Sequence, residues 1–306
     1  MATDLGRIAI DRMLKLLGVE APPPYEQTHR SWVLWGAIQH AWWEPAVTPY
    51  VDPIWTLLLR TLAVEGFSAS RAQSVVLSAP FAPPTLACLV QSADSPDRLE
   101  MATNLEVHRE NVEWVSRVLA VAARVQAAEA RMFSELKGLG WVGLRPGADI
   151  NASTPPGLLL EPSEVFLGGL GFEPVSKAWP ETEVMECIGV LRLRTGADAV
   201  RPSPGMTATL ILHSARRPQG ILDINVRATH PLLGRGLSLT LTTSVVSGPL
   251  NAIVTNSIEV GSKAVGDALG GWSSQPGVLK YTGFYPDVFY RKGLLLRLLL
   301  EYARRA

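Results

Sequence analysis

Hydrophobic residues recur at helical spacing through the first 140 positions of the chain. The pattern predicts short helices over residues 5–17, 28–45, 53–66 and 68–78, separated by turns that contain glycine and proline. The longest periodic stretch begins at Thr103 or Asn104 and ends before Gly138. Its alanine-rich centre is typical of a helix that a neighbouring element approaches closely. We therefore expect a compact helical body in this part of the chain.

The hydrophobic period changes from about 3.6 to about 2 after Gly138. Residues 221–228 and 237–246 alternate apolar and polar side chains, which predicts strands with one buried face and one face in water. No helical crossover separates the strand-like segments, so the pattern favours antiparallel sheets packed as a sandwich. Further strands are predicted over residues 157–160, 164–167, 184–194 and 206–212.

Helical periodicity returns after Gly248, first over residues 250–269 and then in a leucine-rich helix that begins at Asp287. The expected fold class is therefore α+β. A discontinuous all-helical domain, residues 1–140 and 249–306, carries an inserted antiparallel β-sandwich of jelly-roll type, residues 141–248. No repeat at a fixed period is visible, which excludes solenoids and propellers.

Composition and charge exclude several classes of protein. Of the 306 residues 47% are hydrophobic and 18% are charged, as in folded globular proteins. Lys plus Arg number 28, the same as Asp plus Glu, so no net positive field favours nucleic acid as a partner. Cys88 and Cys187 lie far apart without CxxC spacing, and we expect both to be buried small residues. No apolar stretch approaches the roughly 20 residues of a membrane span, and no secretory signal is apparent, so we expect a cytosolic protein.

Motifs for nucleotide binding, zinc hydrolysis and serine catalysis are missing from the sequence. One catalytic alternative stays open. His213 and His230 lie on predicted β elements close in sequence to Asp223. Either histidine would form an acid–base pair with Asp223 if the fold brought them together. Apart from this alternative, the sequence predicts no enzyme, no cofactor and no metal site.

Aromatic and leucine-rich segments supply the candidates for an oligomer interface. Five of the nine tryptophans fall within residues 32–55, where they serve either as core or as interface anchors. The terminal helix has leucines on more than one stripe, which predicts burial against the body and against another subunit. The interface candidates are Trp42, Trp43, Phe284, Tyr285, Leu295 and Leu299.

The order of helices, β insert and returning helices resembles that of the trimeric T=13 shell proteins of double-stranded RNA reoviruses. Three stretches carry the resemblance: residues 57–84, residues 249–260, and Thr282 to Asp287 with the helix that follows. The orbivirus core-surface protein and the rotavirus middle-layer protein are the nearest comparisons.

The resemblance implies a structural virion protein found in the virion and, during assembly, in the host cytoplasm. It would be a homotrimer that tiles a T=13 icosahedral capsid layer through lateral trimer–trimer contacts, over an inner-shell capsid protein and beneath an outer-layer viral protein. Balanced charge suits such a lattice, because many copies pack side by side without accumulating repulsion. The alternatives are the enzyme described above and a module that binds carbohydrate or protein.

Overall fold

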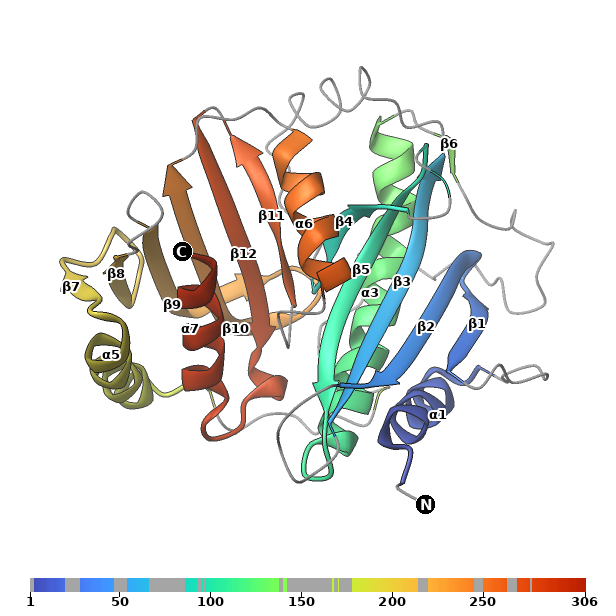
Figure 1. Ribbon diagram of the computed structural model, residues 1–306, viewed down its shortest axis with the longest axis horizontal. Coiled ribbons are helices and arrows are strands. Elements are labelled where there is room, and N and C mark those ends of the chain that lie inside the picture. Colours follow the sequence, from blue (N-terminus) through green and yellow to red (C-terminus); the bar gives the residue numbers. More distant parts are fainter. Residues whose placement is uncertain are drawn as a thin grey trace.

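Two antiparallel sheets lie side by side in the computed structural model, each with helices packed against it (Figure 1). The structure describes residues 3–19, 28–46, 54–65, 86–92, 95, 97–137, 140–141, 167, 170, 178–213, 220–244, 250–262, 269–275 and 277–306. The helix predicted over residues 68–78 and the strand predicted over residues 157–160 lie outside these described ranges. The strand predicted over residues 164–167 also lies outside them except for Leu167, which is helical.

The first sheet has the strand order β1-β2-β3-β5-β4, and a short strand, β6, pairs with β3. Helices α1 and α3 contact each other and cover one face of this sheet. The elements are α1 (Leu5–Leu17), β1 (His29–Leu34), β2 (Ala37–Pro45), β3 (Trp55–Glu65), β4 (Cys88–Gln91), β5 (Leu99–Val107), α3 (Val112–Lys137) and β6 (Gly140–Trp141).

The second sheet has the strand order β11-β12-β10-β9-β8-β7, and helices α5 and α7 contact each other beside it. Its elements are α5 (Glu181–Thr195), β7 (Asp198–Val200), β8 (Ala208–Leu212), β9 (Gly220–His230), β10 (Gly234–Ser244), α6 (Leu250–Ser262), β11 (Gly270–Gln275), β12 (Val278–Pro286), η1 (Asp287–Phe289) and α7 (Leu294–Arg305).

The two halves repeat one topology. Each begins with a helix, continues as a three-strand meander and a two-strand hairpin, and closes with a helix. In the second half, α6 lies between the meander and the hairpin, and none of the described elements of the first half corresponds to it. The spatial order β1-β2-β3-β5-β4 of the first half matches β8-β9-β10-β12-β11 of the second, with β7 as an extra edge strand. Therefore α1 corresponds to α5, and α3 corresponds to α7. This repeat has no counterpart in a fixed sequence period.

The expected all-helical domain is wrong, because residues predicted as helices form β1, β2 and β3. These strands carry large apolar side chains on both faces, which hides the period of two that identifies a half-buried strand. A two-residue turn joins β1 to β2, with Trp35 at φ 52 and Gly36 at φ 83. Positive φ at both positions is typical of a hairpin turn of type I′.

The inserted β-sandwich is also wrong, because β11 and β12 complete the second sheet from within the expected returning helical part. In addition, the strand predicted over residues 184–194 is helix α5. Pro180 precedes this helix, Glu181 and Glu183 lie in its first turn, and Gly196 ends it in the left-handed conformation. These are ordinary signals for the start and end of a helix.

The remaining predicted helices are present, although two of them begin later than predicted. Helix α1 begins after Asp4, whose carboxylate accepts from the Arg7 N–H at 2.9 Å, and it ends at Gly18.

The predicted start at Thr103 or Asn104 is wrong, because these residues belong to β5 and α3 begins at Val112. The predicted start at Asp287 is also wrong, because Asp287 opens η1 and α7 begins at Leu294, while α6 covers most of the predicted range. Strands β8, β9 and β10 match their predicted segments.

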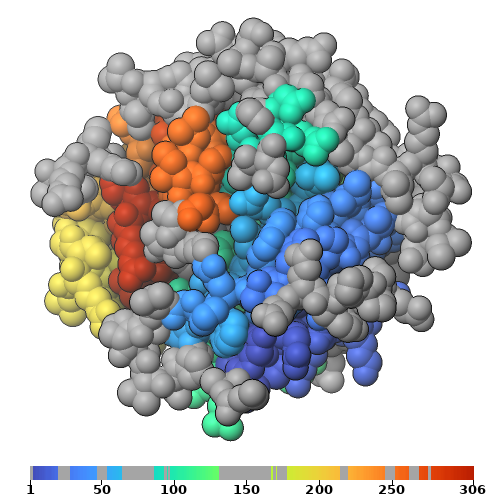
Figure 2. Space-filling view, turned by 45° about the vertical axis from the view of Figure 1, so that its right-hand side comes forward, coloured from blue at the N-terminus to red at the C-terminus, as the bar shows by residue number. Residues whose placement is uncertain are grey.

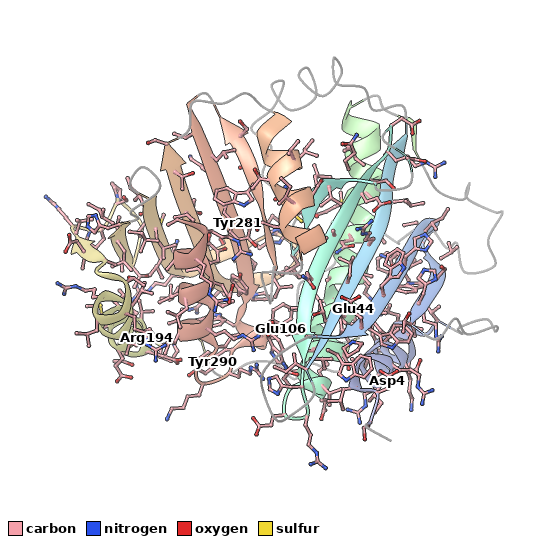
Figure 3. The ribbon with its side chains drawn as sticks, in the orientation of Figure 1. Asp4, Glu44, Glu106, Arg194, Tyr281 and Tyr290 are labelled. Atoms are coloured by element: carbon pink, nitrogen blue, oxygen red, sulfur yellow. The ribbon has the colours of Figure 1, made fainter. Side chains whose placement is uncertain are left out.

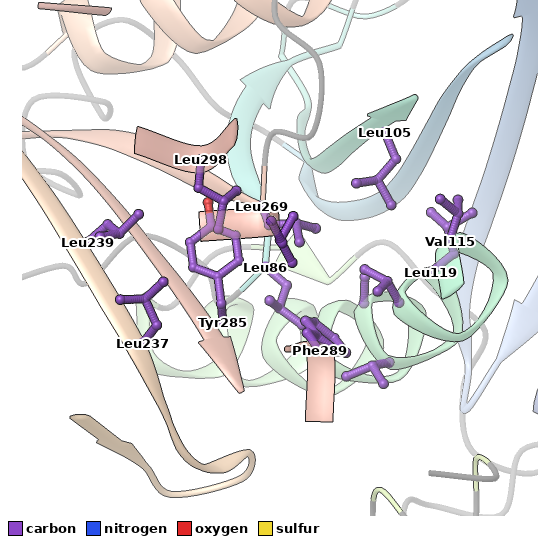
Figure 4. Packing of buried hydrophobic residues seen from close by; sticks show 14 of the residues in the cluster. Leu86, Leu105, Val115, Leu119, Leu237, Leu239, Leu269, Tyr285, Phe289 and Leu298 are labelled. Carbon is purple, nitrogen blue, oxygen red and sulfur yellow. The ribbon is translucent and has the colours of Figure 1, made fainter. Parts of the chain in front are cut away.

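One continuous hydrophobic core joins the halves (Figure 4). Leu105, Val115 and Leu119 of the first half and Leu237, Tyr285 and Leu298 of the second half all belong to it. Phe289 lies close to α3, and Trp114 of α3 donates its indole N–H to the Phe289 carbonyl at 3.1 Å. The halves are therefore packed as one body.

Helix α6 closes the seam where the sheet edges β4 and β11 meet. Its Val260 packs against Cys88, Val90 and Ala102 of the first sheet. Buried Asn256 donates to the Leu89 carbonyl at 3.0 Å and accepts from the Trp272 N–H at 2.8 Å. A single side chain thus satisfies backbone groups of both edge strands, which do not pair directly with each other.

Candidate binding face on the first sheet

The face of the first sheet opposite α1 and α3, hereafter the outer face, holds the candidate site. Gln39 of β2 donates to the Ala123 carbonyl of α3 at 2.8 Å, and Trp43 donates to Asp4 before α1 at 3.2 Å. Because successive residues of a strand point to opposite faces, Ile38, His40 and Trp42 belong to the outer face. All three are half-buried.

Three rings stack on the outer face next to the β1 edge. His29 lies opposite Trp42 in the β1–β2 register, with ring centroids 4.7 Å apart. His40 stacks on both, at 5.6 Å from His29 and 5.4 Å from Trp42. Ser31 lies between the imidazoles, with its Oγ 2.9 Å from His40 Nδ1 and 3.3 Å from His29 Nε2. We call these four residues the ring cluster.

A cation adjoins the ring cluster. Arg60 of β3 lies opposite His40 in the β2–β3 register, and its guanidinium carbon is 5.5 Å from the centroid of the Trp42 ring. The same guanidinium donates to buried Glu100 at 3.0 Å, which fixes its position on the sheet. A fixed cation beside an indole strengthens an aromatic recognition surface.

Half-buried aliphatic side chains extend the outer face around the ring cluster. Val33 and Ile38 form a cross-strand pair, and Leu58 lies opposite Trp42. In Figure 2, α6 (orange) lies next to the strands of the first sheet (blue to cyan) on the face turned toward the viewer. Because α6 packs over the β4–β5 side and Leu58 of β3 packs against the same cluster, the β1–β2 side is the part of this sheet that offers aromatic and aliphatic surface.

The seam contains a small pocket with room for about one water molecule. Cys88, Asn104, Asn256, Glu259 and Tyr281 are among its lining residues. Burial raises the pKa of the Cys88 thiol to about 12, so this cysteine is a poor nucleophile. Both cysteines are buried and free, as predicted. The pocket is too small for an organic substrate.

The residues of the catalytic alternative do not come together. His213 contacts Asp198 at 2.9 Å in an exposed pair. Asp223 accepts from Thr209 at 2.6 Å. His230 lies on the same strand as Asp223, seven residues away, which is about 23 Å at strand spacing. This acid–base pair is therefore not assembled.

The six interface candidates divide into two groups. Trp43, Tyr285, Leu295 and Leu299 are buried in the core of the chain itself. Trp42 and Phe284 are half-buried on sheet faces, and for these two an oligomer contact stays a prediction. The buried set reflects a limit of sequence reasoning, because a large apolar side chain has the same pattern in a core and in an interface.

Among the described residues, no group of three or more His, Cys, Asp or Glu side chains is placed to hold a metal ion. No helix within the described ranges is both long enough and apolar enough to cross a membrane.

Sequence reasoning missed the ring cluster because residues 28–45 were assigned to a helix. On a helix, His29, His40 and Trp42 do not share a face. The available signal was Gly36, which marks a two-residue turn between two apolar segments of similar length. Compared with models of known families, with curated proteins and with solved structures, the chain shows no match.

Proposed function

We propose that this protein is a non-catalytic scaffold that binds an extended segment of a partner polypeptide along β1. The observation that carries the proposal is the ring cluster, which lies directly beside an edge strand of six residues. Main-chain hydrogen bonds to a sheet edge supply affinity, and alternate side chains supply specificity.

The geometry of the edge supports strand addition. His29, Ser31 and Val33 alternate along β1 on the outer face, so an added strand would place its own alternate side chains beside them, at about 5 Å between Cβ atoms. Aromatic and aliphatic side chains of the partner fit this row best, since His29 and Val33 offer a ring and a branched aliphatic group. Among the other edge strands of the described sheets, β4 and β11 pack against α6, and β7 has only three residues, all of them exposed.

The shell-protein expectation rested on a helical base and a separate β head, and that architecture is not the one found. Self-assembly into a capsid layer therefore loses its structural argument and needs its own measurement. A binding module was among the alternatives, and it agrees best with the half-buried aromatic rings of the outer face. Absence of catalysis is part of the proposal.

The test is selection of peptides from a displayed random library against the whole protein, followed by titration calorimetry. We expect peptides with alternating aromatic or aliphatic residues, and Trp42→Ala should weaken their binding at least about tenfold. Phe284→Ala is the matched control, because Phe284 is a half-buried aromatic residue on the second sheet. Its affinity should stay within about twofold of the parent protein.

Two results would contradict the scaffold. One is that no selected peptide depends on Trp42. The other is formation of sheets or closed shells by the concentrated protein in electron micrographs, which would favour the shell expectation instead.

A further inference from the structure

Helix α5 presents an apolar stripe to solvent at one end of the molecule, far from the ring cluster (Figure 1). Leu193 is 90% exposed and Met185 is 63% exposed. Gly189 lies between them on the same side, with open space around its Cα. These three residues, spaced four apart, form the α5 stripe.

The fold does not require this stripe. Helix α1 occupies the corresponding place in the first half, and there the outward positions are charged: Arg7, Asp11, Arg12 and Lys15 are exposed. The core face of α5 is complete without the stripe, since Val184, Cys187, Ile188 and Leu191 are its buried residues. An exposed apolar surface that the scaffold can omit indicates an interaction site.

The stripe is also held in a fixed position. Glu183 accepts from the Tyr290 O–H at 2.7 Å and from the Gly293 N–H at 3.2 Å, which ties α5 to the segment before α7. Glu181 pairs with Arg227 of β9 at 2.6 Å. A partner therefore meets a preorganised helix.

Two charged residues of α5 lie at equal distances before and after Gly189, and they carry opposite charges. Glu186 lies three residues before Gly189 and Arg192 lies three residues after it, while Met185 and Leu193 lie four before and four after. Figure 3 shows Arg194 on the same helix at the end of the molecule. The amino-terminal half of the helix is thus acidic and the carboxyl-terminal half is basic.

From this arrangement we infer that α5 is a self-association site whose occupant is α5 of a second copy of the chain, packed antiparallel about a twofold axis at Gly189. Antiparallel packing places the acidic half of each helix beside the basic half of the other and Met185 near Leu193 of the second copy. The missing side chain at Gly189 lets the helices approach closely at the axis. The contact is small, below the roughly 1,200 Å² of stable complexes, so we expect a weak dimer with a dissociation constant of about 100 µM.

The first test is cross-linking of Gly189→Cys with a mild oxidant, in which two thiols lose two electrons and two protons to form one disulfide. Helix axes about 10 Å apart bring the two Gly189 Cα atoms to about 5 Å, within the range of a disulfide. Gly261→Cys is the matched control, because Gly261 is also an exposed helical glycine with open space around it. We expect a covalent dimer from the first variant, abolished by adding Leu193→Glu, and none above background from the second.

The second test is sedimentation equilibrium of uncross-linked variants. Leu193→Glu should raise the dissociation constant at least about tenfold. Glu186→Arg and Arg192→Glu should each raise the dissociation constant about fivefold. The double variant should return to within about twofold of the parent, because it again places an acidic residue of one copy beside a basic residue of the other. A protein that stays monomeric up to about 1 mM, equal cross-linking of the two cysteine variants, or additive losses in the double variant would each overturn the inference. None of these readouts depends on the ring cluster.

Discussion

The two halves of this protein share one topology but differ in what fills it. In the first half, a chain of fully buried polar groups links the sheet to α3. Trp32 donates to Gln39 at 2.8 Å, Gln39 donates to Thr61 at 2.9 Å, and Thr61 donates to Gln126 at 2.7 Å. In the second half, the corresponding space is aromatic, and the Tyr281 and Tyr302 rings meet edge to face at 5.1 Å.

The outer surfaces differ as well. Strands β1 and β2 of the first half carry the ring cluster, whereas β9, which corresponds to β2, presents Asp223, Asn225 and Arg227 on the face opposite its buried residues. The helices differ in the opposite sense, since the exposed positions of α1 are mainly charged, whereas α5 exposes the apolar side chains of Met185 and Leu193 among its charged residues. The comparison teaches that the topology sets which positions are buried, while the chemistry of each face is free to diverge.

The largest effect is expected at the buried cations. Arg305 donates to Glu259 at 3.1 Å and lies 4.2 Å from the Tyr281 ring centroid. Arg305→Met should lower the free energy of unfolding by about 3 kcal/mol, since it leaves the half-buried Glu259 carboxylate without this partner. The measurement is urea unfolding followed by circular dichroism.

Arg30 of the first half is the matched comparison. It is buried beside Trp43, at 5.4 Å from that ring, but Asp11, its carboxylate partner at 3.7 Å, is half exposed. Arg30→Met should therefore cost only about 1 kcal/mol. Equal losses for the two variants would show that the halves do not differ in this way.

The polar chain of the first half gives the next effect. Gln39→Leu removes the acceptor of the buried Trp32 indole N–H, and we expect a loss of about 2 to 3 kcal/mol in urea unfolding. Thr243→Val is the control in the second half, because the Thr243 hydroxyl donates to the Leu279 carbonyl at a long distance of 3.5 Å. It should cost less than about 1 kcal/mol. If Gln39→Leu left the free energy of unfolding unchanged, the polar chain would add specificity to the fold without adding stability.

The seam should respond locally. Asn256→Ala removes the side chain that bonds to the Leu89 carbonyl and the Trp272 N–H, and it should lower the free energy of unfolding by about 2 kcal/mol. Hydrogen exchange at the Trp272 amide should accelerate more than exchange within β3 or β10. Ser257→Ala loses a hydrogen bond from the exposed Gln91 N–H and should lower the free energy of unfolding by only about 0.5 kcal/mol. It should leave the Trp272 amide protected from exchange.

The smallest effect concerns pH. Burial lowers the pKa of His230, whose Nδ1 also accepts from the Leu232 N–H at 3.2 Å. The unfolded chain then binds this proton more readily than the folded chain, so the contribution of His230 is present above pH 6.5 and is lost as pH falls through the lowered pKa. His230→Gln should reduce the loss of melting temperature between pH 8 and pH 5. An unchanged pH profile would assign that loss to other groups.

Several elements followed from local sequence because their signals are local. Asp4 and Gly18 bound α1, and strict alternation over residues 221–228 identifies β9 without reference to any other part of the chain. For the same reason, Pro180 and Gly196 were sufficient to identify α5, and the strand prediction there gave too much weight to its apolar content.

The candidate site could not be predicted in this way. Trp42 and Trp43 are adjacent and chemically identical, yet Trp43 is buried against α1 and Trp42 lies on the outer face. Which of them is buried depends on the side from which α1 and α3 cover β2. That choice is made by residues far away in sequence.

The sequence by itself determined the capped helices, the alternating strands, the buried cysteines and the balance of charge, because each depends on neighbouring residues or on composition. Only the tertiary structure decided that apolar segments with two hydrophobic faces become strands, that β11 and β12 join β10 in one sheet, and that two halves share one topology. The physical reason is that a segment apolar on both faces satisfies helix and strand equally well. Pairing with distant strands supplies the backbone hydrogen bonds that settle the choice.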